Sequence, residues 1–114
     1  RTLVFTQRED APSLPNVEYI RLDFNIDILP QIMEVLYREK LQSLMVEGGS
    51  ILLQSLIDTN CWDEAYIECS DALLKDGIKA PKLAGNYDSL TIRRFGKEIN
   101  YALNRASEQE NEAE

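Results

Sequence analysis

Short apolar runs alternate with polar connections in the first half of the chain. Leu3-Val4-Phe5 is a first apolar run, and Val17-Glu18-Tyr19-Ile20 alternates in character, so both predict β-strands. Pro12 and Pro15 lie in the polar segment between them, which we expect to be a loop. A third and nearly all-apolar run, Ser43-Leu44-Met45-Val46, is typical of a strand that is buried on both faces.

A helical repeat separates the second run from the third. Asp27 is a suitable N-cap, and Pro30 falls in the first turn, where its missing N–H costs little. Behind the cap, apolar residues recur at intervals of three and four and predict one buried helical face, formed by Ile28, Leu29, Ile32, Met33, Leu36 and Tyr37. Glu39 and Lys40 should end this helix.

A second helix should follow Glu47-Gly48-Gly49-Ser50. Its inner side is expected to carry Ile51, Leu52, Ser55 and Leu56. Asn60 and Asp63 are plausible breakers before a further strand at Ala65 to Cys69. This alternation of strands and helices favours parallel strands joined by right-handed crossovers.

The last third of the chain has a different pattern. Asp71 to Asn86 should form a long connection, and Leu90 to Phe95 with Glu98 to Leu103 predict an antiparallel hairpin. Gly96 in the first central position suits a type II′ turn. The expected fold class is therefore α/β, with a mixed, mostly parallel sheet and a C-terminal antiparallel hairpin.

Composition adds limits on partners and location. A chain of 114 residues with 44% hydrophobic and 28% charged residues is one ordinary globular domain at most. The net charge is −8, and residues 108–114 carry four Glu, so we expect an acidic, disordered tail over 107–114 and no nucleic-acid surface. No apolar run approaches the ~20 residues of a membrane-spanning helix, which favours a cytoplasmic protein that does not enter a membrane.

Two cysteines and no histidine restrict the chemistry. Cys61 and Cys69 lack the further ligands of a tetrahedral zinc site, so no metal is predicted. Ser-His-Asp or Cys-His catalysis is impossible without His. Both cysteines are expected to be reduced structural thiols. A bound cofactor or a carboxylate would have to supply any reaction.

The segment Val46 to Ser50 is the most informative for chemistry. Two glycines between a strand and a helix permit a tight turn whose free amides, at the positive end of the helix dipole, favour an anion by roughly 0.3–1 kcal/mol. A pyrophosphate would fit there. The alternative is that the glycines only pack strand against helix, with Ser50 as the N-cap, since the spacing of the stronger dinucleotide fingerprint is absent. Glu47 would repel phosphates unless it accepts hydrogen bonds from a donor-rich second ligand or from nearby backbone amides.

Several segments together resemble one family. Ser43 to Ser50, Leu56-Ile57-Asp58 and Trp62 to Ile67 closely resemble the reductase domain of the bifunctional riboflavin-biosynthesis deaminase–reductase. Gly77 to Leu83 is similar to the connection that follows in this family, and Ile92 to Ile99 to its closing hairpin. The resemblance implies a dihydrofolate-reductase-like, three-layer αβα fold, in which a comparable strand ends in glycines beneath the pyrophosphate of NADPH.

The resemblance also implies roles for individual residues. Glu47 would contact the pyrimidine substrate, and Thr6 would lie near the adenosine end of NADPH. Arg8 could pair with the 2′-phosphate that distinguishes NADPH from NADH, the alternative being an exposed loop arginine. The residues expected to line the cofactor's phosphates are Gly48, Gly49, Ser50, Ile51, Leu52, Leu53, Gln54 and Ser55.

The implied activity is the NADPH-dependent reduction of the ribosyl group of 5-amino-6-(5-phosphoribosylamino)uracil to ribityl, with no side chain needed as a proton-transfer catalyst. Residues 1–106 would be the later part of the reductase domain, so we expect the chain alone to be inactive and its exposed strand edges to favour a homodimer. Cys69 to Leu73 departs from the family's Ala-Pro-Lys-Leu stretch. The alternatives are another dihydrofolate-reductase-like pterin or pyrimidine reductase, and a non-catalytic α/β binding module.

Overall fold

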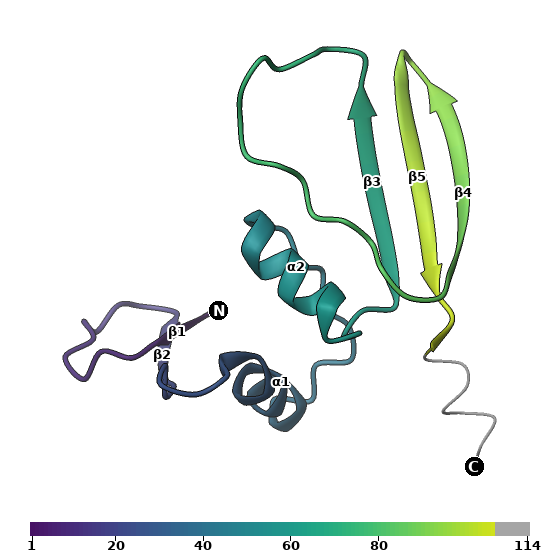
Figure 1. The fold of residues 1–114 in the computed structure, drawn as a ribbon. Helices are drawn as coiled ribbons and strands as arrows, with labels where there is room; N and C mark the ends of the chain where they lie inside the picture. The colour runs from purple at the N-terminus through teal and green to yellow at the C-terminus, as the bar shows by residue number, and fades with distance from the viewer. Residues whose placement is uncertain (107–114) are drawn as a thin grey trace. The chain divides into compact units, whose positions relative to one another are not determined.

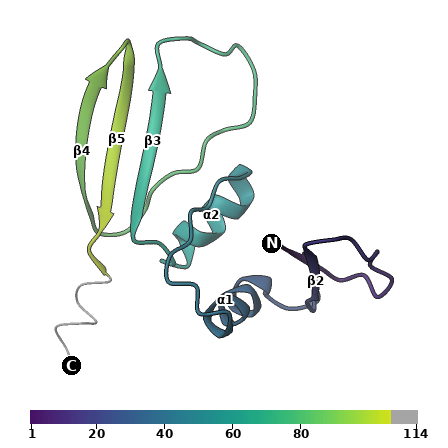
Figure 2. The same cartoon turned by 180° about the vertical axis from the view of Figure 1, so that it is seen from behind.

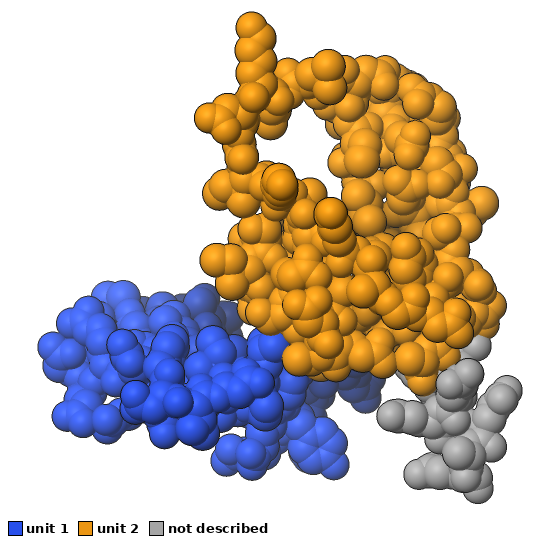
Figure 3. Space-filling model, in the orientation of Figure 1, with its two compact units in different colours: residues 1–45 blue, residues 46–114 orange. Residues whose placement is uncertain are grey.

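The computed structural model describes residues 1–106, in which two helices and five strands occur in the order β1-β2-α1-α2-β3-β4-β5 (Figures 1 and 2). The chain divides into two compact units, Arg1–Met45 and Val46–Glu114 (Figure 3), and each is described by itself. The predicted acidic tail at 107–114 lies outside the described residues. Neither helix of the described part is long and apolar enough to span a membrane.

Two parallel strands form the sheet of the first unit. β1 (Thr2–Thr6) pairs with β2 (Val17–Arg21) in register along all five residues, which confirms both predicted strands. The ladder continues past the end of β1, because the Leu22 amide donates to the Thr6 carbonyl at 2.9 Å. The carboxyl ends of both strands therefore lie at the same edge of this sheet.

α1 (Ile28–Arg38) begins and ends as its sequence predicts. The Asp27 carboxylate accepts a hydrogen bond from the Leu29 amide at 3.1 Å, and this cap starts the helix. Leu29 is buried at 9% exposure, as is Leu22 at 7%. Of the six residues expected on the apolar face, Tyr37 alone is exposed, at 82%.

The predicted strand Ser43 to Val46 is not formed. These residues have no regular secondary structure and belong to no described sheet, and Leu44 and Met45 are 52% and 84% exposed. Burying a strand on both faces requires neighbouring strands that pair its backbone N–H and C=O groups. None of the five described strands pairs with this segment, which spans the boundary between the two units.

The second unit contains an antiparallel sheet of three strands. β5 (Lys97–Asn104) lies between β3 (Glu64–Ser70) and β4 (Tyr87–Arg94). The strand expected at Ala65 to Cys69 is confirmed, but its neighbour is antiparallel rather than parallel. The predicted C-terminal hairpin is confirmed, with longer strands than expected.

α2 (Ser50–Asp58) precedes this sheet, and its C-terminal turn leads into the core of the unit. Leu56 and Ala102 are buried at 6% and 1% exposure. The side chain of Asn104, 2% exposed, donates 2.8 Å hydrogen bonds to the Asn60 side chain and to the Trp62 carbonyl. These bonds hold the turn after α2 against β5 and satisfy a buried amide that would otherwise be costly.

The inner side of α2 differs from the prediction at its N-terminal end. Ile51 and Leu52 are 84% and 39% exposed, whereas Leu56 is buried. The single, mostly parallel sheet is also not observed, since the described strands form one parallel and one antiparallel sheet. The α/β class with mixed strand directions is confirmed. The three-layer arrangement stays a prediction.

The hairpin turn is shifted by one residue from the expected position. Arg94 pairs with Lys97, so Phe95 and Gly96 are the two central residues. Both have positive φ, 54° and 71°, as a type I′ turn requires, instead of the predicted type II′ turn. Phe95 is 92% exposed, and the Arg94 guanidinium lies 5.5 Å from its ring centroid. A bulky residue in this left-handed conformation is strained.

Replacing Phe95 should therefore reveal the cost of its backbone conformation. Phe95→Asn and Phe95→Ala both remove the ring, but only Asn adopts positive φ readily, so the Asn variant should be more stable by about 0.5–1 kcal/mol. Urea unfolding followed by Trp62 fluorescence would measure the difference, because Trp62 contacts Tyr87 at the start of β4. Equal stability of the two variants would show that the turn is unstrained.

Candidate functional site

The turn before α2 leaves the first amides of the helix without a side-chain cap. Gly49 is the N-cap, with φ −66° and ψ 157°, and its carbonyl accepts from the Leu53 amide at 3.2 Å. Having no side chain, Gly49 caps none of the first-turn N–H groups. Ser50 is the first helical residue, so the alternative in which Ser50 is the N-cap is wrong. The turn therefore keeps the bare amides that an anion requires.

Neither glycine of this turn is needed for the backbone conformation or for the packing of the chain. Gly48 and Gly49 do not have positive φ, so neither is needed for a left-handed backbone conformation. A Cβ added to Gly49 would meet nothing within 4 Å, and one added to Gly48 would make an ordinary 3.5 Å contact with Leu52. Close packing of the glycines against the helix is thus not observed. Their bare backbone leaves room for an approaching group.

Glu47 lies exposed immediately before these glycines. It follows no strand, and within residues 1–106 it forms no hydrogen bond or ion pair. The alternative that nearby backbone amides satisfy this carboxylate is therefore wrong for the described chain. Its acceptor capacity is available to a ligand that carries donors.

Further along α2, two side chains of the expected cofactor-lining set are already engaged. The Gln54 amide accepts from the Lys82 N–H at 2.9 Å and donates to the Lys82 carbonyl at 3.1 Å. It also donates to Asp58 at 2.9 Å. The Ser55 hydroxyl donates to the Ile51 carbonyl at 2.8 Å. Gln54 thus fixes the long connection between β3 and β4 beside the helix. We call this arrangement, in which one glutamine side chain bonds both the N–H and the C=O of a loop residue, a glutamine clamp.

In the first unit, the predicted residues Thr6 and Arg8 lie at the carboxyl end of β1. The Thr6 hydroxyl accepts from the Arg8 backbone N–H at 3.1 Å. The Arg8 guanidinium forms two hydrogen bonds to the Asp10 carboxylate, at 3.2 and 3.3 Å, and its side chain is 64% exposed. This contact lowers the pKa of Asp10 below its ordinary value. Arg8 is therefore an exposed loop arginine with a carboxylate partner.

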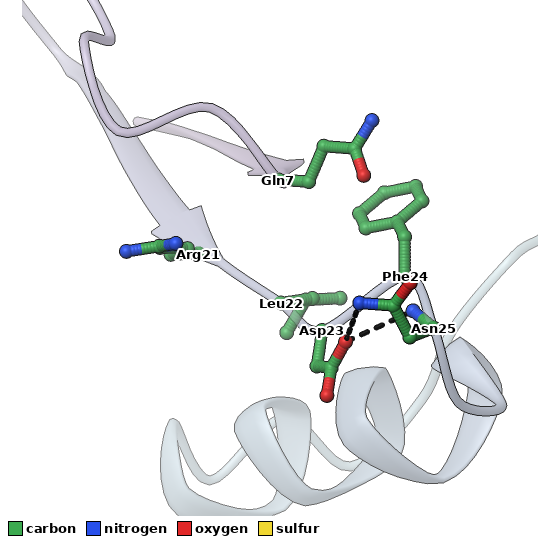
Figure 4. Close-up of a pocket in the computed structure, with 6 residues that line it drawn as sticks. All are labelled: Gln7, Arg21, Leu22, Asp23, Phe24 and Asn25. Carbon is green, nitrogen blue, oxygen red and sulfur yellow. Dashed lines mark hydrogen bonds between the residues drawn. The ribbon is translucent and has the colours of Figure 1, made fainter.

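A hollow of about 560 Å³ opens at this same edge of the parallel sheet (Figure 4). Its lining is formed by Gln7, Arg21, Leu22, Asp23, Phe24 and Asn25. Gln7 follows β1, and the remaining residues come from the end of β2 and the segment after it. The carboxyl ends of parallel strands are where α/β proteins bind ligands. The hollow offers one aromatic ring and several polar side chains to such a ligand.

A second glutamine clamp shapes this hollow. The Gln31 side chain accepts from the Asp23 N–H at 2.9 Å and donates to the Asp23 carbonyl at 2.8 Å. The Asp23 carboxylate in turn accepts from the backbone and side-chain N–H groups of Asn25, at 2.9 and 3.0 Å (Figure 4). Hydrogen bonds thus fix both the backbone and the side chains of the segment between β2 and α1.

Sequence reasoning missed this hollow. It identified the strand that ends at Ile20 and the cap at Asp27 but assigned nothing to the residues between them. The available signal was the pattern Asp23-Phe24-Asn25, polar groups and one aromatic residue directly after a strand. In the described chain both cysteines are free and exposed, and no group of three His, Cys, Asp or Glu could hold a metal ion.

Comparison with known sequences identifies one family. The family model of the RibD C-terminal domain matches residues 1–90, most of the chain and both candidate regions. No curated protein sequence matches the chain.

The glutamine clamp of α2 can be tested by proteolysis. Gln54→Ala removes both bonds to the Lys82 backbone, so trypsin should cut after Lys82 several-fold faster, relative to its cleavage after Lys75. Ser55→Ala is the matched control, because its hydroxyl bonds only within the helix. Mass spectrometry of the fragments gives the ratio, and an unchanged ratio in Gln54→Ala would contradict the clamp.

Proposed function

Since the chain belongs to the RibD C-terminal domain family, we propose that it is part of the NADPH-dependent pyrimidine reductase of riboflavin biosynthesis. This family is a reductase domain of that pathway and uses a nicotinamide cofactor. The proposed reaction is the reduction of 5-amino-6-(5-phosphoribosylamino)uracil, in which the ribosyl group becomes ribityl. NADPH supplies the hydride, and the residues of the chain bind and orient the reactants.

The turn before α2 is assigned to the pyrophosphate of NADPH. The observation that carries this assignment is Gly49, whose missing Cβ serves neither the backbone conformation nor the packing of the chain. A phosphate needs close backbone approach and unpaired amides, and this turn offers both. Gly48, Ser50, Ile51 and Leu52 share the site, whereas Leu53, Gln54 and Ser55 support the helix behind it.

The hollow in the first unit is assigned to the adenosine end of the cofactor. The Phe24 ring is 45% exposed and provides a surface on which a base can stack, a contact worth roughly 1–3 kcal/mol. Thr6 lies directly before the lining residue Gln7. Arg8 is assigned to the 2′-phosphate, which competes with Asp10 for the guanidinium.

Glu47 is assigned to the substrate. Its carboxylate would repel a phosphate placed beside it, but the pyrimidine and its amino groups carry several N–H donors. The exposed position of Glu47 and its lack of a partner within residues 1–106 support this role. No described side chain is assigned as a proton donor or acceptor, so the role of the chain is binding and orientation.

Gly49→Asp tests the pyrophosphate assignment. Asp is a good N-cap, so the helix should be as stable as before or more stable by a few tenths of a kcal/mol. Its carboxylate would occupy the amides and repel phosphate, so NADPH should bind at least about tenfold more weakly. Gly49→Asn has the same size without the charge and should show a smaller loss. Equal NADPH affinity of the three proteins, measured by fluorescence titration, would refute the assignment.

Arg8→Gln tests the 2′-phosphate assignment. Loss of a charge-assisted contact should weaken NADPH binding roughly tenfold to a hundredfold and leave NADH binding unchanged. Asp10→Asn should have the opposite effect, because it removes the competing carboxylate. Arg38→Gln, similarly exposed on α1, is the control. An equal loss for both dinucleotides in Arg8→Gln would place the 2′-phosphate elsewhere.

A further inference from the structure

Two arginines at the carboxyl edge of the parallel sheet are each held by the loop between β1 and β2. Arg21, the last residue of β2, donates from Nη2 to the Glu9 carboxylate at 2.7 Å. Arg8 donates to the next residue, Asp10, through two N–H groups at 3.2 and 3.3 Å. Two consecutive acidic residues thus each bind one guanidinium, and we call Glu9 and Asp10 the acidic pair.

The pairing of the strands brings the backbones of these two arginines together. Thr6 and Arg21 are direct partners across the two strands, and the Leu22 amide donates to the Thr6 carbonyl at 2.9 Å. The Thr6 hydroxyl accepts from the Arg8 backbone N–H at 3.1 Å, which bends the chain directly after β1. Thr6 therefore connects the two arginines, one from each strand end.

The hollow in the first unit borders on Arg21, which lies at the end of β2 (Figure 4). Among the six lining residues, Arg21 alone is basic and Asp23 alone is acidic. The Asp23 carboxylate already accepts the backbone and side-chain N–H groups of Asn25, at 2.9 and 3.0 Å. An anionic group on a ligand in this hollow is therefore favoured at the side of Arg21.

Both ion pairs of the acidic pair are weak enough to be exchanged for a ligand. The side chains of Arg21 and Glu9 are 63% and 76% exposed, and those of Arg8 and Asp10 are 64% and 82% exposed. Ion pairs this exposed contribute little, because water solvates both partners. A phosphate monoester carries nearly two negative charges and three acceptor oxygens, and arginine binds it through parallel N–H groups. One phosphate can therefore accept from both guanidiniums in place of the acidic pair.

We infer that Arg21 is a second guanidinium for the 2′-phosphate of NADPH, and that the acidic pair holds both arginines until the cofactor binds. The inference rests on the proposed function, in which the hollow takes the adenosine and Arg8 contacts this phosphate. NADH has an uncharged ribose hydroxyl at the same place, which cannot displace two carboxylates. Arg21 and Arg8 thus determine the preference for NADPH, and Glu9 and Asp10 set its strength.

Two isomeric nucleotides that differ only in the position of the phosphate test this inference on the 114-residue chain. Adenosine 2′-monophosphate and adenosine 5′-monophosphate are titrated separately into the ¹⁵N-labelled chain at physiological ionic strength, where distant charges are screened. The amide shifts of residues 22–25 give both dissociation constants. The wild type prefers the 2′-isomer at least about tenfold. Arg21→Gln lowers this preference at least about threefold, whereas a structural defect would weaken both isomers alike.

The ion pair of α1 provides matched controls. Arg38 is 69% exposed and pairs with Glu34 at 3.4 Å, so Arg38→Gln and Glu34→Gln leave the preference unchanged. Glu9→Gln increases the preference, because it removes the carboxylate that competes for Arg21. The double variant Arg21→Gln with Glu9→Gln behaves as Arg21→Gln alone, because Glu9 acts through Arg21.

The outcomes separate this inference from the proposed function. If neither nucleotide moves the amides of residues 22–25, the hollow does not bind adenosine, and both the assignment of the hollow and the inference fail. If both isomers bind there with equal affinity, or with the same preference in wild type and Arg21→Gln, the adenosine assignment stands and the inference is overturned. A lower preference in Glu9→Gln would also overturn it, since the acidic pair would then not compete with the phosphate.

Discussion

Pairing of backbone N–H and C=O groups between strands determines which of the predicted strands of this chain can be buried. β5 has a partner on each side and contributes Ala102 and Asn104 to the core of its unit. Among the described strands, β1 and β2 pair only with each other, and Ser43 to Val46 pairs with none. An extended segment without a partner cannot leave water at low cost, whatever its side chains. The apolar run that carries the strongest family resemblance is therefore exposed in this chain.

The candidate site depends on a different constraint, the absence of side chains at the two glycines directly before α2. Gly49 caps none of the first-turn amides, and apart from its chain neighbours no described atom lies within 4 Å of the place where its Cβ would be. The two glutamine clamps act around the candidate regions, because Gln31 fixes Asp23 beside the hollow and Gln54 fixes Lys82 beside α2. Each clamp satisfies one N–H and one C=O of a loop residue, which orders that loop without regular secondary structure.

Local patterns in the sequence predicted local structure well. The cap at Asp27 and the spacing behind it were sufficient for α1, since both depend on residues one or two turns apart. The run Ser43 to Val46 was wrongly predicted to form a buried strand, because burial of a strand depends on neighbouring strands that its own residues do not specify. The turn at Phe95 was misplaced by one residue, since the register of the long flanking strands outweighed the preference of Phe for negative φ. The hollow beside Asp23 was missed because a helical glutamine eight residues away shapes it.

Binding of an anion by the bare amides before α2 is the interaction on which the proposed function depends most. Amide NMR spectra of the ¹⁵N-labelled chain, recorded during addition of NADPH, test this directly. The largest shifts are expected on the N–H groups of Gly49, Ser50 and Ile51, with saturation at the same NADPH concentration for all three. Saturable shifts confined to other parts of the chain, with these three amides unmoved, would contradict the proposed function.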